Sequence, residues 1–223
     1  MSINKEKYQE IITELDNHAT LVAVSKTKSA EDIMELYNLG HRDFGENYVQ
    51  ELVDKAALLP QDIRWHFIGH LQSNKVKFIA PFIHLIHAVD SVSVLTEINK
   101  QAAKINRVID CLLQIYIAKE ETKFGLDHHE AETLMTQIVA NPGNFSNVNI
   151  KGLMGMASFT NDTHKVKDEF HHLKNLYHKF TIHDSPFTIL SMGMSSDYKI
   201  ALKEGSNMVR IGSLLFGERN YSK

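Results

Sequence analysis

The feature of this sequence that most constrains its fold is a repeated alternation between short apolar runs and longer amphipathic stretches. Eight short runs, mostly apolar and β-branched, are predicted to be strands: residues 21–24, 43–44, 65–68, 85–89, 111–117, 152–156, 188–191 and 208–211. Between them, apolar side chains recur at helical spacing over residues 30–39, 49–56, 92–105, 131–140 and 166–180. Strands that alternate with helices in this way pair in parallel.

Eight strands in a chain of 223 residues favour closure into a barrel over an open, doubly wound sheet. We therefore predict one α/β domain over residues 1–223, a (β/α)8 TIM-type barrel. An additional helix over residues 4–17 precedes the first strand, and we expect it to cap the bottom of the barrel. In this fold the active site lies at the carboxyl ends of the strands, and phosphate often binds after strands seven and eight.

Composition excludes several classes of function. The net charge is −3 with histidine neutral, which gives no electrostatic basis for binding nucleic acid or an anionic membrane. The N-terminus lacks the apolar core of a signal peptide, and no apolar run reaches the length of a membrane span. Cys111 is the only cysteine, and its apolar neighbours predict a buried thiol. We expect a cytoplasmic protein without intramolecular disulfides.

The first predicted strand ends at Lys26. Burial lowers the pKa of a lysine amine, and a neutral amine can form a Schiff base with an aldehyde. The alternative is a structural lysine whose amine extends to solvent from the end of a strand. Lys28 is a second candidate two residues later, and we favour Lys26 because it follows the strand more closely.

The second and third strands end near further polar groups. Asn47 is a candidate ligand to a bound ring, or alternatively the N-cap of the next helix. Trp65 and His66 alternate, so one of them faces the barrel interior, where a lone histidine is more often a packing residue than an acid or base. The other histidines show no metal-ligand spacing, and we predict no metal site.

The last two strands carry small residues where barrels bind phosphate. Backbone N–H groups of such turns form anion sites, and the candidates are Ser191, Gly193, Met194, Ser195, Gly212 and Ser213. Arg210 lies within the eighth apolar strand, where a cation must be paired or must act electrostatically on a ligand. We favour the electrostatic role over a structural ion pair.

Six segments together resemble one family. They read AVSKTK (residues 23–28), FGENYVQE (44–51), WHFIG (65–69), LQSNK (71–75), SMGMSSD (191–197) and VRIG (209–212). Each motif alone is weak, but in this order they are similar to the YggS/PROSC family of pyridoxal 5′-phosphate (PLP) homeostasis proteins. The resemblance covers nearly the whole chain.

The resemblance implies a barrel of the alanine racemase N-terminal-domain type with PLP as an internal aldimine on Lys26. It implies that the turns at residues 191–195 and 212–213 hold the phosphate. From their places near the strand ends, we predict Asn47 and His66 as further cofactor contacts. Arg210 looks like the arginine that faces the pyridine nitrogen. A permanent cation there disfavours ring protonation and so weakens the cofactor as an electron sink.

Three functions are compared on the sequence. The first is a PLP carrier that influences vitamin B6 and amino- and keto-acid pools, with PLP-dependent apoenzymes as candidate recipients. The second is a PLP-dependent amino-acid racemase, which needs an acid/base group on each face of the cofactor. The chain runs to Lys223 without a second, β-rich domain to supply the opposite base, so we expect a monomeric carrier without turnover. A lysine-dependent aldolase would not account for Arg210 or the combined motifs.

Overall fold

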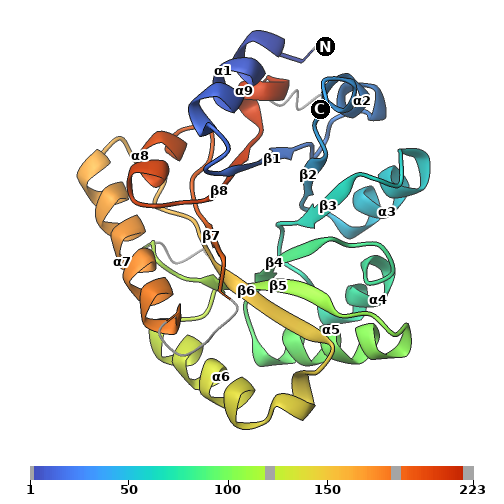
Figure 1. Cartoon of the computed structure of the whole chain (residues 1–223), viewed down its shortest axis with the longest axis vertical. Helices are drawn as coiled ribbons and strands as arrows, with labels where there is room; N and C mark the ends of the chain where they lie inside the picture. Colours follow the sequence, from blue (N-terminus) through green and yellow to red (C-terminus); the bar gives the residue numbers. More distant parts are fainter. Residues whose placement is uncertain (1–2, 119–123, 182–186, 218–223) are drawn as a thin grey trace, which may run out of the picture.

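A computed structural model describes residues 3–118, 124–181 and 187–217. Each of its eight strands pairs in parallel with the next, and β8 pairs with β1, so that the sheet is a closed barrel (Figure 1). The strands are β1 (Thr20–Val24), β2 (Asp43–Glu46), β3 (Arg64–Phe67), β4 (Leu85–Val89), β5 (Ile109–Ile115), β6 (Val148–Gly155), β7 (Ile189–Ser191) and β8 (Met208–Ile211). All eight predicted strands are present, and the predicted (β/α)8 fold is confirmed.

Helices surround the barrel on its outside (Figure 1). They are α1 (Lys5–Leu15), α2 (Ala30–Asn38), α3 (Val49–Leu58), α4 (Val76–Ile79), α5 (Val92–Lys104), α6 (His128–Ala140), α7 (Thr163–Thr181), α8 (Tyr198–Lys203) and α9 (Ser213–Phe216), with 3-10 turns η1 (Ser73–Lys75) and η2 (Pro142–Phe145). The short helices α4, α8 and α9 were not predicted, because one or two turns are too short to show a helical period.

The predicted N-terminal helix exists as α1, but it does not cap the bottom of the barrel. It lies in the outer ring beside α9, between α8 and α2 (Figure 1). Glu14 of α1 accepts a hydrogen bond from the Tyr198 hydroxyl of α8 at 2.7 Å, and Lys5 lies 3.7 Å from Glu35 of α2. The buried face of α1 packs against the barrel as the other helices do. A helix at this position therefore completes the outer ring of helices and does not cover the bottom of the barrel.

Side chains alternate between the barrel interior and the layer beneath the helices. Val22, Leu112 and Met154 form a small apolar cluster separate from the main core. Trp65 belongs to the main core, so the ring of His66 faces the interior. Cys111 is fully buried in the main core, as predicted, and burial raises the pKa of its thiol.

The main core lies between the strands and the helices. Along α7 the buried residues include Val166, Phe170, Leu173 and Leu176, which recur at helical spacing as the sequence predicts. In the described ranges, no helix combines the length and the apolar character that crossing a membrane requires.

Phe170→Ala is expected to reduce the free energy of unfolding by about 3–5 kcal/mol, because it removes a fully buried ring and leaves a cavity. Urea unfolding followed by circular dichroism measures the change. Leu58→Ala is the control, since Leu58 is 77% exposed, and a change within about 0.5 kcal/mol is expected there. Equal losses in the two variants would contradict the assignment of the core.

Candidate functional site

A cavity of about 370 Å³ opens at the carboxyl ends of the strands, which we call the mouth cavity. Its volume falls within the range of roughly 300–1,000 Å³ that is typical of small-molecule sites. Its lining includes seven of the residues predicted from the sequence: Lys26, Asn47, Met194, Ser195, Arg210, Gly212 and Ser213. Residues from both halves of the chain therefore meet at one place, where this fold puts its active sites.

Lys26 is half-buried and follows β1 by two residues. The next residue, Thr27, has a φ of 63°, a left-handed conformation that is strained for a β-branched side chain. Its backbone N–H donates to Glu51 Oε1 at 2.6 Å, which holds this turn in place. Lys28 Nζ also borders the mouth cavity, but it donates to the backbone carbonyl of Phe216 at 2.8 Å.

A buried network of charged side chains between the barrel and α3 holds the turn that contains Lys26 in place. Lys55 Nζ donates to Ser25 O at 2.8 Å, to Glu46 Oε1 at 2.8 Å and to Glu51 Oε1 at 2.6 Å. The Ser25 hydroxyl also donates to Glu46 Oε1, at 2.6 Å. Burial raises the pKa of Glu46, and the Lys55 ammonium opposes that shift. This role of Glu46 and Lys55 was not predicted, although the i, i+4 spacing of Glu51 and Lys55 is a visible signal in the sequence.

The turns after β7 and β8 are joined to each other. Gly193 has a φ of 97°, and a Cβ there would lie 2.6 Å from Ala201 Cβ, so the turn requires glycine. Arg210 N donates to Gly193 O at 3.0 Å, and Gly212 N donates to Ser195 Oγ at 3.3 Å. These bonds place small residues and hydroxyl groups of both turns along one side of the mouth cavity.

Arg210 is a buried cation at the mouth cavity. Its guanidinium donates from Nη1 to Ser191 Oγ at 2.6 Å and from Nη2 to Gly155 O at 3.0 Å. Burial lowers the pKa of Arg210 to about 10, and Asp197 opposes the shift, so the side chain stays cationic at neutral pH. Among the described residues its hydrogen-bond acceptors are uncharged, which agrees with the predicted electrostatic role better than with a structural ion pair.

Three predicted residues do not line the mouth cavity. Ser191 lies beneath Arg210, and Gly193 is buried in its turn. His66 lies deeper in the barrel and borders a different cavity, of about 600 Å³, at the amino ends of the strands. The inward-facing residue that reaches the mouth here is Ile68, which directly follows β3 and lies two residues after His66. The prediction of a direct cofactor contact by the His66 ring is therefore not supported by its position.

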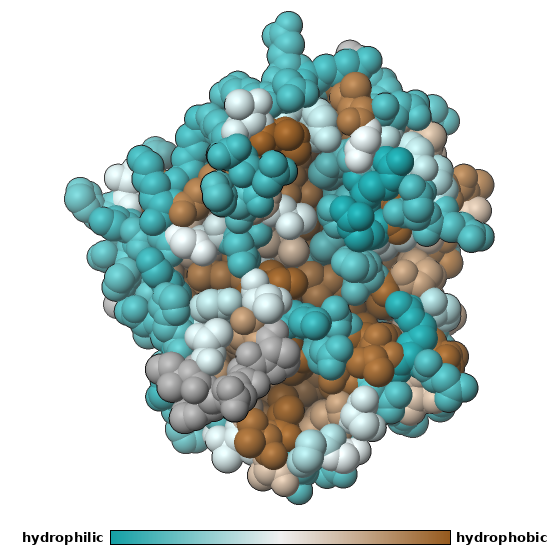
Figure 2. Space-filling view, in the orientation of Figure 1, coloured by the Kyte–Doolittle hydropathy of each residue, from teal (hydrophilic) through white to brown (hydrophobic). Residues whose placement is uncertain are grey.

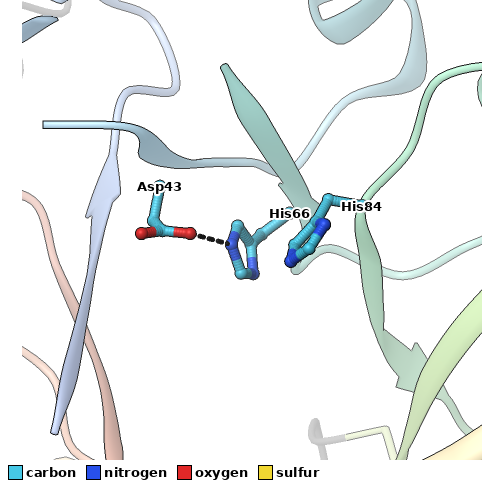
Figure 3. Close-up of side chains that lie close together, drawn as sticks. All are labelled: Asp43, His66 and His84. Carbon is cyan, nitrogen blue, oxygen red and sulfur yellow. Dashed lines mark hydrogen bonds and ion pairs between the residues drawn. The ribbon is translucent and has the colours of Figure 1, made fainter. Parts of the chain in front are cut away.

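At the amino ends of the strands, Asp43, His66 and His84 bring potential metal-ligating atoms within 4.8 Å of one another (Figure 3). Arg64 already donates to both oxygens of Asp43, at 2.7 and 2.5 Å. A guanidinium in this position opposes a bound cation, so we interpret the group as an internal ion pair with neighbouring histidines. No sequence spacing indicated it, because each residue comes from a different segment of the barrel.

An apolar depression of about 680 Å³ lies beside α6 and α7 and includes Val139, Phe145 and Phe180. Hydrophobic residues are exposed toward the lower edge of Figure 2, where Figure 1 draws α6. The charged groups in its lining, Glu132 and Lys179, are paired with each other. This depression therefore offers less chemistry than the mouth cavity.

The mouth cavity suits an anionic ligand with an aromatic ring and a carbonyl group. Asn47 Oδ1 is buried without a hydrogen-bond partner among the described residues, so a polar acceptor is left for a ligand to satisfy. The lining adds two amines, a guanidinium and hydroxyl groups to apolar side chains such as Ile68 and Met156. This donor-rich set fits a phosphorylated aldehyde, which places a carbonyl near a lysine and a phosphate near the turns after β7 and β8.

Comparisons with known proteins agree on one family. A model of the alanine racemase N-terminal domain matches residues 3–220. The pyridoxal phosphate homeostasis protein of Aquifex aeolicus is 40% identical over 208 residues, which cover 92% of this chain and 90% of that protein. The human pyridoxal phosphate homeostasis protein is 41% identical over 217 residues, covering 91% of this chain and 78% of that protein.

Solved structures give the same result. PipY of Synechococcus elongatus without PLP has a TM-score of 0.88 at 32% identity, covering 95% of this chain and 99% of that chain. PipY with PLP bound has a TM-score of 0.84. The alanine racemase of Bartonella henselae shares the fold, with a TM-score of 0.68 at 18% identity over 61% of its length. By sequence and by structure, this chain belongs to the pyridoxal phosphate homeostasis proteins of the alanine racemase N-terminal domain family.

Proposed function

We propose that this chain binds PLP in the mouth cavity and takes part in the homeostasis of PLP and of amino- and keto-acid pools. The observation that carries the proposal is that Lys26, the two small-residue turns and Arg210 line one cavity of about 370 Å³. The names of the homologous proteins and the PLP-bound structure of PipY support it.

In this proposal Lys26 supplies the amine that holds the aldehyde of PLP covalently. The turns that contain Gly193, Met194, Ser195, Gly212 and Ser213 hold the phosphate, and Ser191 acts through Arg210. In the structure Met194 N donates to Asp197 Oδ1 at 2.5 Å and Gly212 N donates to Ser195 Oγ, so these two N–H groups change partners when they bind the phosphate. The amide of Asn47 contacts a ring substituent. PLP itself supplies an electron-withdrawing ring, and the cationic Arg210 beside that ring disfavours protonation of its nitrogen.

The alternative, a PLP-dependent racemase, requires a second acid/base group opposite Lys26. Among the described lining residues, no tyrosine, histidine, cysteine or carboxylate takes that place, and Lys28 is held by the carbonyl of Phe216. This lining supports a carrier or regulator without turnover. We further propose a cytoplasmic monomer that delivers PLP to PLP-dependent apoenzymes.

Lys26→Ala is expected to abolish covalent PLP binding, because Lys28, the other amine of the described lining, is held by the carbonyl of Phe216. The wild-type protein incubated with PLP should be yellow, and borohydride should fix the cofactor on the peptide that contains Lys26, as mass spectrometry will show. Lys28→Ala is the matched control and should still be labelled on Lys26. Failure of the wild-type protein to take up PLP would sink the proposal, and labelling of Lys28 instead would reassign the lysine.

The racemase alternative is tested with the same proteins. The PLP-loaded wild type is incubated with L-alanine and other amino acids, and the products are separated by chiral chromatography. We expect no conversion above the Lys26→Ala background. Sustained formation of the D-enantiomer that depends on Lys26 would refute the carrier proposal and support the racemase.

Gly193→Ala is expected to weaken PLP binding by about tenfold or more, because the new Cβ displaces the turn that holds the phosphate. Binding of pyridoxal, which lacks the phosphate, should change much less. Gly205→Ala is the matched control, since Gly205 has a similar φ of 98° but lies in the loop between α8 and β8. Equal losses of affinity for PLP and pyridoxal would argue against a phosphate turn at Gly193.

A further inference from the structure

A continuous line of polar side chains crosses the interior of the barrel. It begins at the mouth, where Arg210 Nη1 lies 2.6 Å from Ser191 Oγ. Ser191 Oγ lies 3.3 Å from His87 Nδ1, and His87 Nε2 lies 2.9 Å from His66 Nδ1. The line ends at the amino ends of the strands, where His66 Nε2 lies 3.0 Å from Asp43 Oδ1 (Figure 3).

With one proton on each imidazole ring, the carboxylate end of this line fixes the direction of every hydrogen bond in it. The carboxylate of Asp43 only accepts, so His66 carries its proton on Nε2 and accepts at Nδ1 from His87 Nε2–H. His87 Nδ1 then accepts from the Ser191 hydroxyl. The oxygen of that hydroxyl has a further lone pair, which accepts from the Arg210 guanidinium.

The surroundings agree with this assignment of protons. Burial lowers the pKa of His87 well below its ordinary value, so its ring is neutral. Although burial raises the pKa of Asp43, its hydrogen bonds from His66 and Arg64 lower it further, so the carboxylate is ionised. One tautomer of each ring therefore satisfies all the hydrogen bonds of the line.

Filling the interior of a barrel does not require polar side chains such as these. His87 and Ser191 are fully buried, and the same interior contains the apolar cluster of Val22, Leu112 and Met154. Replacing hydrogen-bonded buried polar groups by apolar side chains of similar volume is often neutral or stabilising. What apolar residues cannot do is hold a buried guanidinium, and Ser191 is one of its two hydrogen-bond acceptors among the described residues.

We propose that His87 is a positioning residue for the cofactor site. It fixes the Ser191 hydroxyl, and through it the Arg210 guanidinium, at the place where the ring of PLP binds. His66 and Asp43 act behind His87 by fixing its tautomer. The proposal rests on the proposed function, because His87 can position Arg210 for a cofactor only if PLP binds in the mouth cavity.

The first test determines the tautomers of His66 and His87 in the absence of cofactor. Nitrogen-15 NMR of the imidazole rings distinguishes the two neutral tautomers, and His66→Gln and His87→Gln identify the signals. We expect both rings of the cofactor-free wild type to be neutral with the proton on Nε2 at neutral pH. A proton on Nδ1 of either ring, or a charged ring, would overturn the directed line whether or not PLP binds.

The second test measures how substitutions of His87 change the binding and the absorption of PLP. His87→Leu removes the acceptor of the Ser191 hydroxyl, whereas His87→Gln can still accept from Ser191 and donate to His66. For His87→Leu we expect PLP affinity to fall by about tenfold and the absorption band of bound PLP to shift. His87→Gln should stay within about threefold of wild type and keep the wild-type band.

His84→Leu is the matched control. His84 packs edge-on against His66, with ring centroids 5.4 Å apart, but it is not part of the line. It should leave both affinity and absorption unchanged. If His87→Leu does not fold, Ser191→Ala takes its place. It removes both the hydrogen bond to His87 and the one from Arg210, so an unchanged affinity for PLP still refutes the positioning role.

The outcomes separate the two proposals. If wild type binds PLP and His87→Leu (or Ser191→Ala) leaves affinity and absorption band unchanged, the positioning role is refuted and the proposed function stands. A fall in affinity for His87→Leu with rescue by His87→Gln supports the positioning role. If His84→Leu produces the same loss as His87→Leu, the effect is general to the barrel interior and the role of His87 is refuted.

Discussion

The parallel pairing of β8 with β1 is the interaction on which the rest of the structure depends. It closes the sheet, with Val22 opposite Arg210 and Ala23 opposite Ile211. Closure brings the two ends of the chain together, so that the Lys26 turn after the first strand borders the same cavity as Gly212 after the last. Without this pairing, the lysine and the phosphate turns would belong to opposite edges of an open sheet.

Closure also creates a barrel interior with room for few side chains, and one of them in this protein is the charged side chain of Arg210. Arg210 stays cationic although it is buried, which is possible because Ser191 and Gly155 accept its hydrogen bonds. On the other side of the strands, Lys55 neutralises the buried Glu46 and holds the backbone at Ser25. The mouth cavity is thus supported by two polar networks, one inside the barrel and one between the barrel and α3.

The sequence predicted the repeating elements well, because hydrophobic periodicity is a local property. It located all eight strands and the long helices α1, α2, α3, α5, α6 and α7. Strand ends followed by glycine and serine indicated the turns at Gly193 and Gly212. The sequence misjudged the place of α1 and the depth of His66, since the position of a helix around a barrel and the layer of an inward residue depend on closure and register.

By itself the sequence determined the order of the strands, the residues at their ends and, through motifs spread over the chain, the family. It also determined that a lysine, an arginine and two small-residue turns would be available for a phosphorylated ligand. Only the tertiary structure decided that Ser191, His87, His66 and Asp43 form one line behind Arg210, and that Lys55 binds Glu46 and Ser25. The physical reason is that these contacts join residues on different strands and helices, whose distances are set by the shear and closure of the barrel rather than by spacing along the chain.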